Sequence, residues 1–137
     1  MKFVKISQDE LTKVRQLYES IISYACHGLF YREGVLFGAK IAEIAKNSKD
    51  EFFNAVAAIL EARGWVDSID FEDGQATVKG SVEVKPGSET ETCHRIRGII
   101  SSVYGEHLGR QIRLVESDCE SLGSDNCVFI IEPDSEE

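Results

Sequence analysis

Apolar residues in the first half of the chain recur every three or four positions. This spacing predicts one helix over 8–25 and a second over 34–46. A third helix is predicted to begin at a capping box formed by Ser48 and Glu51 and to stop at Gly64. The first half of the chain is therefore expected to be helical throughout.

The pattern then changes to an alternation of period two. Segments 65–71 and 76–84 flank Asp73-Gly74, which is a strong signal for a β-hairpin. In the second segment one face is predicted to be buried and carries Ala76, Val78, Gly80, Val82 and Val84. The opposite face is predicted to be wet and carries Thr77, Lys79, Ser81 and Glu83.

The last third of the chain predicts one more helix and one more hairpin. Ser88 and Glu91 offer a capping box for a helix that runs to about His107. Segments 111–116 and 127–132 read as two strands that pair with each other. The expected order is three helices, a hairpin, a helix and a hairpin, which favours an α+β fold with helices on one face of an antiparallel sheet.

Composition narrows the classes of function. The 137 residues predict a single domain over 1–137 with an acidic tail at about 133–137. Net charge is -9, from 24 acidic and 15 basic residues, which argues against nucleic acid and against an anionic membrane surface as partners. No apolar run is long enough to span a bilayer, and the start of the chain lacks a secretory signal. These observations predict a cytoplasmic protein with reduced thiols.

The candidate chemistry lies in the last two predicted strands. Ile112, Leu114 and Glu116 share one strand face, so a carboxylate points toward the expected core. Cys119 lies three residues after Glu116, where the predicted strand gives way to a loop, and Cys127 begins the next predicted strand. An unpaired carboxylate in an apolar interior costs several kcal/mol, and a bound divalent cation would remove that cost.

Zinc suits the donors at these positions, because it takes four ligands from thiolate, imidazole and carboxylate groups. Cys93 points inward from the start of the fourth predicted helix, and Cys93, Glu116, Cys119 and Cys127 complete such a set. Arg95, Arg97 or Arg113 would offset the excess negative charge of three thiolates and one carboxylate. Alternatives from the residues alone are buried free cysteines with Glu116 at a fraying strand end, and a Cys119–Cys127 disulfide. Cys26-His27 and His94 are further possible ligands, although such residues are more often ordinary packed or surface side chains.

The spacing Cys93, Glu116-x-x-Cys119 and x₇-Cys127, with "GSDNC" leading into an apolar strand, resembles the 4-vinyl reductase (4VR) domain family. It is most similar to the zinc-bearing sensor domains of phenol-responsive transcriptional activators. The resemblance implies three cysteines and a glutamate around a structural zinc, and a fold similar to vesicle-tethering trafficking subunits with a hydrophobic ligand cavity. Four protein ligands leave no open position, so the zinc is expected to be structural and not catalytic.

The resemblance also implies a small hydrophobic ligand, which is aromatic, hydrocarbon or lipid-like. Gly34, Gly38 and Gly80 remove side chains from faces that would otherwise pack, and this predicts a pocket between helices and sheet. The pocket is expected to be bordered by Phe37, Ile41, Trp65, Ile100, Tyr104 and His107. The alternative is that Trp65 and Tyr104 are core residues whose polar tips are satisfied. No histidine of the second helix matches the phenol-binding histidine of the sensors, which leaves an apolar ligand other than phenol open.

The expected function is a stand-alone sensor or regulatory module whose output passes through a signalling partner. One rival is an enzyme or accessory protein in tetrapyrrole vinyl reduction, which needs a nicotinamide or flavin site, and the sequence has no glycine-rich dinucleotide fingerprint. A second rival is a dimeric adaptor without a ligand. A homodimer is expected in either case, because Leu17, Tyr18, Ile21 and Ile22 give the first helix a wide apolar arc and the resembled family commonly dimerises.

Overall fold

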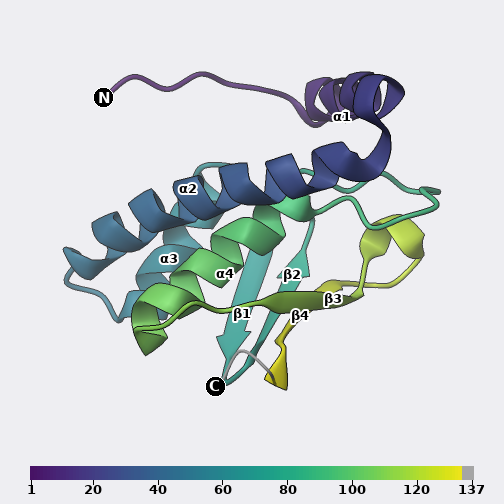
Figure 1. Cartoon of the computed structure of the whole chain (residues 1–137). Coiled ribbons are helices and arrows are strands. Elements are labelled where there is room, and N and C mark those ends of the chain that lie inside the picture. The colour runs from purple at the N-terminus through teal and green to yellow at the C-terminus, as the bar shows by residue number, and fades with distance from the viewer. Residues whose placement is uncertain (134–137) are drawn as a thin grey trace.

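The chain folds into helices packed on one face of a four-stranded antiparallel sheet (Figure 1). This computed structural model describes residues 1–133, so the predicted acidic tail lies almost entirely outside the described residues. The elements are α1 (Gln8–Ile22), η1 (Ser23–Ala25), α2 (Cys26–Lys46), α3 (Phe52–Ala62), β1 (Ser68–Glu72), β2 (Gln75–Lys79), α4 (His94–Leu108), β3 (Leu114–Asp118), η2 (Glu120–Leu122) and β4 (Cys127–Ile131). The strand order is β1-β2-β4-β3. The α+β fold predicted from the sequence is confirmed.

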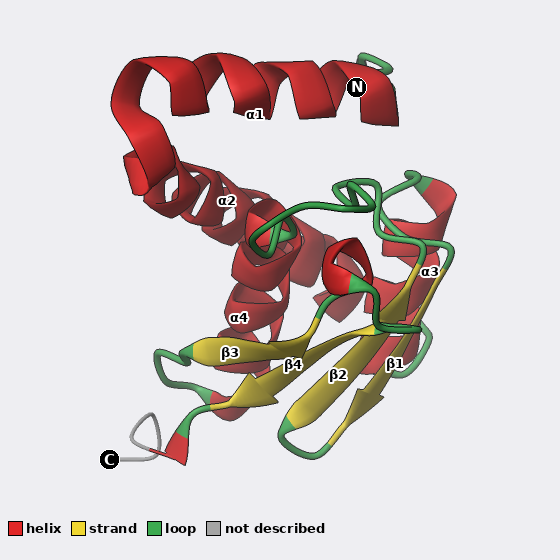
Figure 2. Ribbon diagram, turned by 90° about the vertical axis from the view of Figure 1, so that its right-hand side faces the viewer, coloured by secondary structure: helices red, strands yellow, loops and turns green. Residues whose placement is uncertain are grey.

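One buried cluster joins the helices to the sheet. The sheet contributes Ala76, Val78 and Phe129, and α4 contributes Ile96, Ile100 and Val103. Figure 2 shows the helices gathered on one side of the strands, with α1 farthest from the sheet. Within residues 1–133, no helix combines the length and apolarity that a membrane span requires.

Helix α1 begins where its pattern predicts and ends early. Its N-cap is Ser7, whose Oγ accepts from the Glu10 amide while the Glu10 carboxylate accepts from the Ser7 amide. The helix ends at Ile22 because Ser23 has a φ of 57°, and the chain continues into the turn η1. Arg15 is the buried residue of this helix, so α1 does not enter the apolar core.

Helix α2 begins at Cys26 and not at Gly34, because η1 leads directly into it. Its glycines do make a close approach possible, and the approaching group is the backbone of α4. A Cβ on Gly34 would lie 2.0 Å from the Arg95 carbonyl oxygen, and one on Gly38 would lie 2.6 Å from that of Ile99. The space at these glycines is therefore filled by a helix and does not form part of a ligand cavity.

The predicted capping box of α3 is wrong in its detail. Glu51 is itself the N-cap and accepts from the Asn54 amide at 2.9 Å. Ser48 instead accepts from the Asp50 amide within the preceding turn. Gly64 follows the end of the helix with a φ of 84°, as expected for a residue that stops a helix.

The hairpin at Asp73-Gly74 is confirmed, but β2 ends at Lys79. Gly80 has a φ of 67°, and a Cβ there would lie 2.0 Å from a carboxylate oxygen of Asp67. This left-handed residue shifts the alternation by one position. Ser81 and Glu83, predicted on the wet face, are consequently 2% and 7% exposed.

The predicted capping box of α4 is also wrong, because the helix begins at His94 with Cys93 as its N-cap. The first amides of α4 are capped by Glu83, which accepts from Arg95 N at 3.3 Å and from Ile96 N at 2.9 Å. A carboxylate suits this position, since it faces the positive end of the helix dipole. The final hairpin is confirmed, with its first strand at Leu114–Asp118 and not at 111–116.

Candidate metal centre

Four side chains converge where the start of α4 meets β3 and β4. Cys93 is the N-cap of α4, Glu116 is central in β3, Cys119 follows β3, and Cys127 opens β4. Their ligand atoms, one sulfur from each cysteine and one carboxylate oxygen, all lie within 4.8 Å of one another. The Cys93 and Cys127 sulfurs are 3.8 Å apart. All four cysteines of the chain are free thiols, so the alternative Cys119–Cys127 disulfide is not formed.

Local backbone geometry explains the convergence of β3 and β4. The pairing of these strands shifts between Glu116 and Asp118, so the ladder is irregular just before Cys119. The chain then makes the turn η2 and reverses at Gly123, which has a φ of 101°. The Ser124 amide donates to the Cys119 carbonyl at 3.2 Å and closes this loop. Cys119 and Cys127 therefore face each other across a short, internally bonded turn.

The Glu116 carboxylate is the least satisfied member of the cluster. Its Oε2 atom is buried and has no hydrogen-bond partner among the described residues. Burial, together with the charge of Cys119, raises the pKa of Glu116 to about 9. A cation between the four groups would supply a positive partner for this buried acceptor.

The three thiols are at most 1% exposed and share their protons unequally. Hydrogen bonds from the Cys127 and Cys93 thiols lower the pKa of Cys119 well below its usual range. The same contacts with Cys119 raise the pKa of Cys93 and Cys127. Of the three thiols, Cys119 is therefore the one whose thiolate form the surroundings favour. Metal ligation requires the remaining thiols and Glu116 to lose their protons, which a divalent cation favours.

Two residues missed by the sequence reasoning complete the surroundings of the thiols. The Cys93 thiol lies 3.3 Å from Ser81 Oγ, and the Glu120 amide donates to Cys127 Sγ at 3.4 Å. Glu120 also accepts from the Gly80 amide at 3.0 Å, which ties η2 to the end of β2. Gly80 could have indicated in the sequence that the strand alternation breaks here and that the Ser81 side chain turns inward, because glycine readily adopts a left-handed backbone conformation. No sequence signal marked Glu120.

Of the three arginines predicted to offset the negative charge of the cluster, Arg97 affects Glu116, while Arg95 and Arg113 pair with other carboxylates. Arg97 lowers the pKa of Glu116 through its charge, although burial outweighs this effect. Arg95 instead pairs with Glu83 at 3.3 Å and with Glu33 at 2.9 Å. Arg113 lies 3.8 Å from Glu132.

Comparison with known proteins agrees with the arrangement of these elements. Residues 75–133, which include all four converging side chains, match the family model of the V4R domain. Over this stretch the chain is similar to the V4R family. The resemblance to the 4-vinyl reductase family, predicted from the cysteine and glutamate spacing, is therefore confirmed.

Two solved structures share the fold of this chain at low sequence identity. The phenol-responsive sensory domain of the transcription activator PoxR, solved with phenol, has a TM-score of 0.79 and 18% identity, with 97% of this chain and 77% of that chain covered. A vinyl-4-reductase family protein from Methanocaldococcus jannaschii has a TM-score of 0.66 and 16% identity, with coverage of 96% and 83%. No curated protein matches the chain. At these identities, the likeness concerns the fold alone.

The six residues predicted to border a ligand pocket lie in and around the apolar core of this chain. Ile41, Ile100 and Tyr104 are buried in the apolar cluster, and the Tyr104 hydroxyl lies 2.7 Å from two carbonyl oxygens of the β1–β2 turn. Phe37 is 42% exposed and its ring lies 5.8 Å from that of Trp65. The sixth, His107, stacks on a phenylalanine ring of α3. These residues line neither of the cavities described next, and the pocket stays a prediction.

Two cavities of this chain have linings that mix polar and apolar side chains. One of about 240 Å³ opens beside the thiol cluster and is bordered by Glu116 together with Glu91, His94, Arg97, Leu114, Val115 and Glu132. Solvent therefore approaches the cluster from the side of Glu116.

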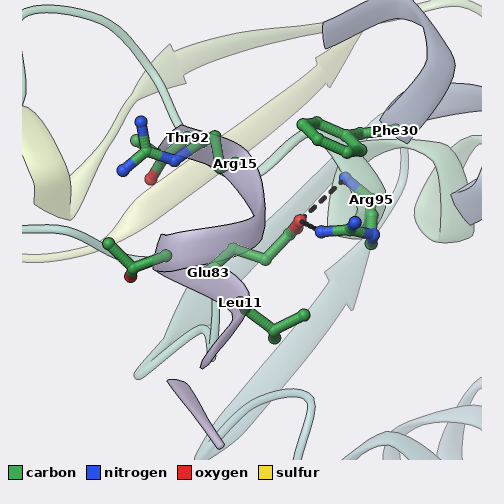
Figure 3. Close-up of a pocket in the computed structure, with 7 residues that line it drawn as sticks. Leu11, Arg15, Phe30, Glu83, Thr92 and Arg95 are labelled. Atoms are coloured by element: carbon green, nitrogen blue, oxygen red, sulfur yellow. Dashed lines mark hydrogen bonds and ion pairs between the residues drawn. The ribbon is translucent and has the colours of Figure 1, made fainter. Parts of the chain in front are cut away.

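The other cavity is small and lies between α1 and the start of α4 (Figure 3). There the Glu83 carboxylate accepts from the backbone and guanidinium of Arg95, while Leu11 and Arg15 of α1 cover it. Burial raises the pKa of Glu83 to about 7, against the opposing effects of the α4 amide and Arg95.

Proposed function

We propose that this chain is a regulatory domain that binds a small hydrophobic molecule and carries a structural zinc at Cys93, Glu116, Cys119 and Cys127. The buried Glu116 oxygen without a donor, surrounded by three thiols, is the observation that carries the zinc assignment. We also propose that residues 1–137 form one domain, since the described core is a single cluster. The free thiols suit a reducing compartment such as the cytoplasm.

The donor set favours zinc over magnesium or calcium, because three soft thiolates dominate it. Four protein ligands fill a tetrahedral shell, so the metal would crosslink α4, β3 and β4 and would leave no position for a substrate. The chain's own residues support this role. The Glu120 amide stabilises the Cys127 sulfur, and Ser81 orients the Cys93 thiol. A structural metal of this kind contributes directly to the free energy of folding.

Elemental analysis of protein purified without chelators tests the metal assignment. Cys127→Ser and Glu116→Gln are each expected to lose one equivalent of zinc relative to the wild-type chain. Glu120→Gln is the matched control, because it alters a carboxylate at the rim of the cluster that is not among the proposed ligands. If both ligand variants keep the full zinc content, the cluster does not hold the metal.

The hydrophobic ligand is proposed from the V4R match and from the fold shared with the phenol-responsive sensory domain of PoxR. The aromatic pair Phe37 and Trp65 offers a route into the core, since Phe37 is partly exposed and Trp65 is half-buried. A ligand that enters there would displace the Phe37 ring. Binding to the native state alone should then quench Trp65 fluorescence and raise the Tm. A screen of aromatics, fatty acids and tetrapyrroles that produces neither effect would favour the dimeric adaptor without a ligand.

A second copy of the chain is the proposed partner of α1. Leu17, Tyr18, Ile21 and Ile22 are between 40% and 68% exposed on this one helix, which is a larger apolar surface than a monomer usually leaves open. Sedimentation at micromolar concentration should give a dimer. Ile21→Glu should shift the population to monomer, whereas Gln16→Glu, an exposed polar site on the same helix, should not. A monomeric wild-type chain would contradict the proposal.

A further inference from the structure

A second group of potential metal-ligand side chains lies where α1 turns into α2. Figure 1 shows this joint between the two helices. Glu19 belongs to the last turns of α1, and Cys26 and His27 are the first two residues of α2. One ligand atom from each of the three lies within 4.8 Å of the others. Glu19 Oε2 and His27 Nε2 are already 2.6 Å apart. The turn η1 thus folds a carboxylate, a thiol and an imidazole onto one point.

Each of these side chains is held in place by a neighbour. The His27 ring is stacked between Tyr24, at a centroid distance of 4.9 Å, and His94, at 4.0 Å. Arg15 Nη1 donates to both Glu19 oxygens, to Oε1 at 3.2 Å and to Oε2 at 3.4 Å, and Oε2 makes its shorter contact with His27. Cys26 is 1% exposed, so its sulfur has little freedom. Such outer contacts are what orient metal ligands in known sites.

The joint combines an aromatic contact with a charged pair. The Tyr18 ring of α1 lies 5.9 Å from the Phe30 ring of α2. Glu19 carries the negative charge of the cluster, and Arg15, the buried residue of α1, is its cationic partner at 3.2 Å. A cation at this point would offset the negative charge of Glu19 and of an ionised Cys26, and would tie the two helices together.

We propose that Glu19, Cys26 and His27 bind a divalent transition metal of the zinc class and that this metal fixes α1 against α2. One thiolate, one imidazole and one carboxylate are all zinc ligands, and tetrahedral coordination separates such atoms by roughly 3.3–3.6 Å. The Glu19–His27 contact of 2.6 Å must lengthen to reach this range when a cation enters. Three protein ligands leave the fourth position to water or to an exogenous ligand, unlike the four-ligand cluster. On binding, Cys26 releases its proton to solvent and its sulfur bonds the metal.

Zinc stoichiometry after equilibrium dialysis tests the site, with Zn²⁺ as the probe. Glu19→Gln and His27→Ala should each bind one equivalent fewer than the wild-type chain. Glu19→Gln keeps the shape and the hydrogen bond to Arg15, so its loss of metal cannot be assigned to misfolding when its circular dichroism is unchanged. Glu43→Gln is the matched control, because Glu43 is an exposed carboxylate on α2 whose nearby cation is Lys40 at 3.6 Å.

The same experiment distinguishes the two proposed metal sites, because each can be removed without changing the ligands of the other. Cys127→Ser removes a ligand of the first cluster and leaves Glu19, Cys26 and His27 intact, so it should retain the equivalent that Glu19→Gln loses. The double variant Glu19→Gln with Cys127→Ser should bind none. If Glu19→Gln and His27→Ala both bind as much zinc as Glu43→Gln, the joint is a hydrogen-bonded cluster and the proposal is overturned.

Discussion

Replacing Gly34 by alanine tests how tightly α2 and α4 are packed. In an open helix the change from glycine to alanine stabilises by about 1 kcal/mol, because alanine loses less backbone entropy. Gly28 lies on the same helix, and a Cβ there would meet nothing within 4 Å. Gly28→Ala is therefore expected to raise the free energy of unfolding by up to about 1 kcal/mol. It serves as the matched control.

At Gly34 the same methyl group has no room. Its carbon would lie 2.0 Å from the Arg95 carbonyl oxygen, whereas ordinary contact begins at 3.4 Å, so the two backbones must separate by about 1.4 Å. Overpacking of this kind typically costs about 1–3 kcal/mol. The carbonyl is part of a helix and cannot rotate aside. Gly34→Ala should consequently be about 2–4 kcal/mol less stable than Gly28→Ala.

Urea denaturation of both variants at one pH measures the difference, provided that their m-values agree. Gly98 lies on the opposite helix, where a Cβ would meet the Tyr31 carbonyl oxygen at 2.1 Å. Once either alanine has forced the helices apart, the other needs less further movement. The double variant with Gly34→Ala and Gly98→Ala should therefore cost less than the sum of the single variants. Equal midpoints for Gly28→Ala and Gly34→Ala would refute the close packing of these helices.

Three further perturbations probe other parts of the molecule. Burial raises the pKa of Glu83 between Arg95 and Arg15 from 4.5 to about 7, so its contribution to stability is complete below pH 4.5 and is lost as the pH rises to 7. Glu83→Gln should remove that part of the pH dependence in urea titrations, and an unchanged profile would exclude the assignment. Tyr104→Phe should lower the free energy of unfolding by about 1–3 kcal/mol, because it leaves carbonyls of the β1–β2 turn without their donor; no loss would show that water replaces it. Cys127→Ser should destabilise the zinc-loaded protein by several kcal/mol and the chelated protein much less, and equal losses would argue against a structural metal.

The convergence of the four proposed ligands could be predicted because each lies in or beside a strongly patterned element. Period two in the final strands turns Glu116 and Cys127 inward, and the apolar face of α4 does the same near Cys93. The fold class follows from the same periodicities. The zinc itself and the pocket residues remain predictions, since a pattern of burial does not identify what a cavity or a cluster binds.

The predictions that rested on glycines were the ones that the structure most often contradicts. Missing side chains at Gly34, Gly38 and Gly80 were interpreted as space for a ligand, yet a backbone or a carboxylate fills each position. A sequence shows where a side chain is absent and does not show which neighbour takes the room. The start of α4 was misplaced for a related reason, because its cap is Glu83, a residue far outside the local capping pattern.

The departure from strand geometry at Gly80 connects these errors to the metal centre. Because Gly80 is left-handed, Ser81 and Glu83 turn inward when simple alternation would turn them outward. Glu83 then caps the first amides of α4, which fixes the point at which the helix begins, and Cys93 is the N-cap at that point. Ser81 reaches the Cys93 sulfur from the same segment. A substitution of Gly80 would therefore strain one residue of a turn and also displace the first ligand of the proposed zinc site, although Gly80 contributes no side chain to it.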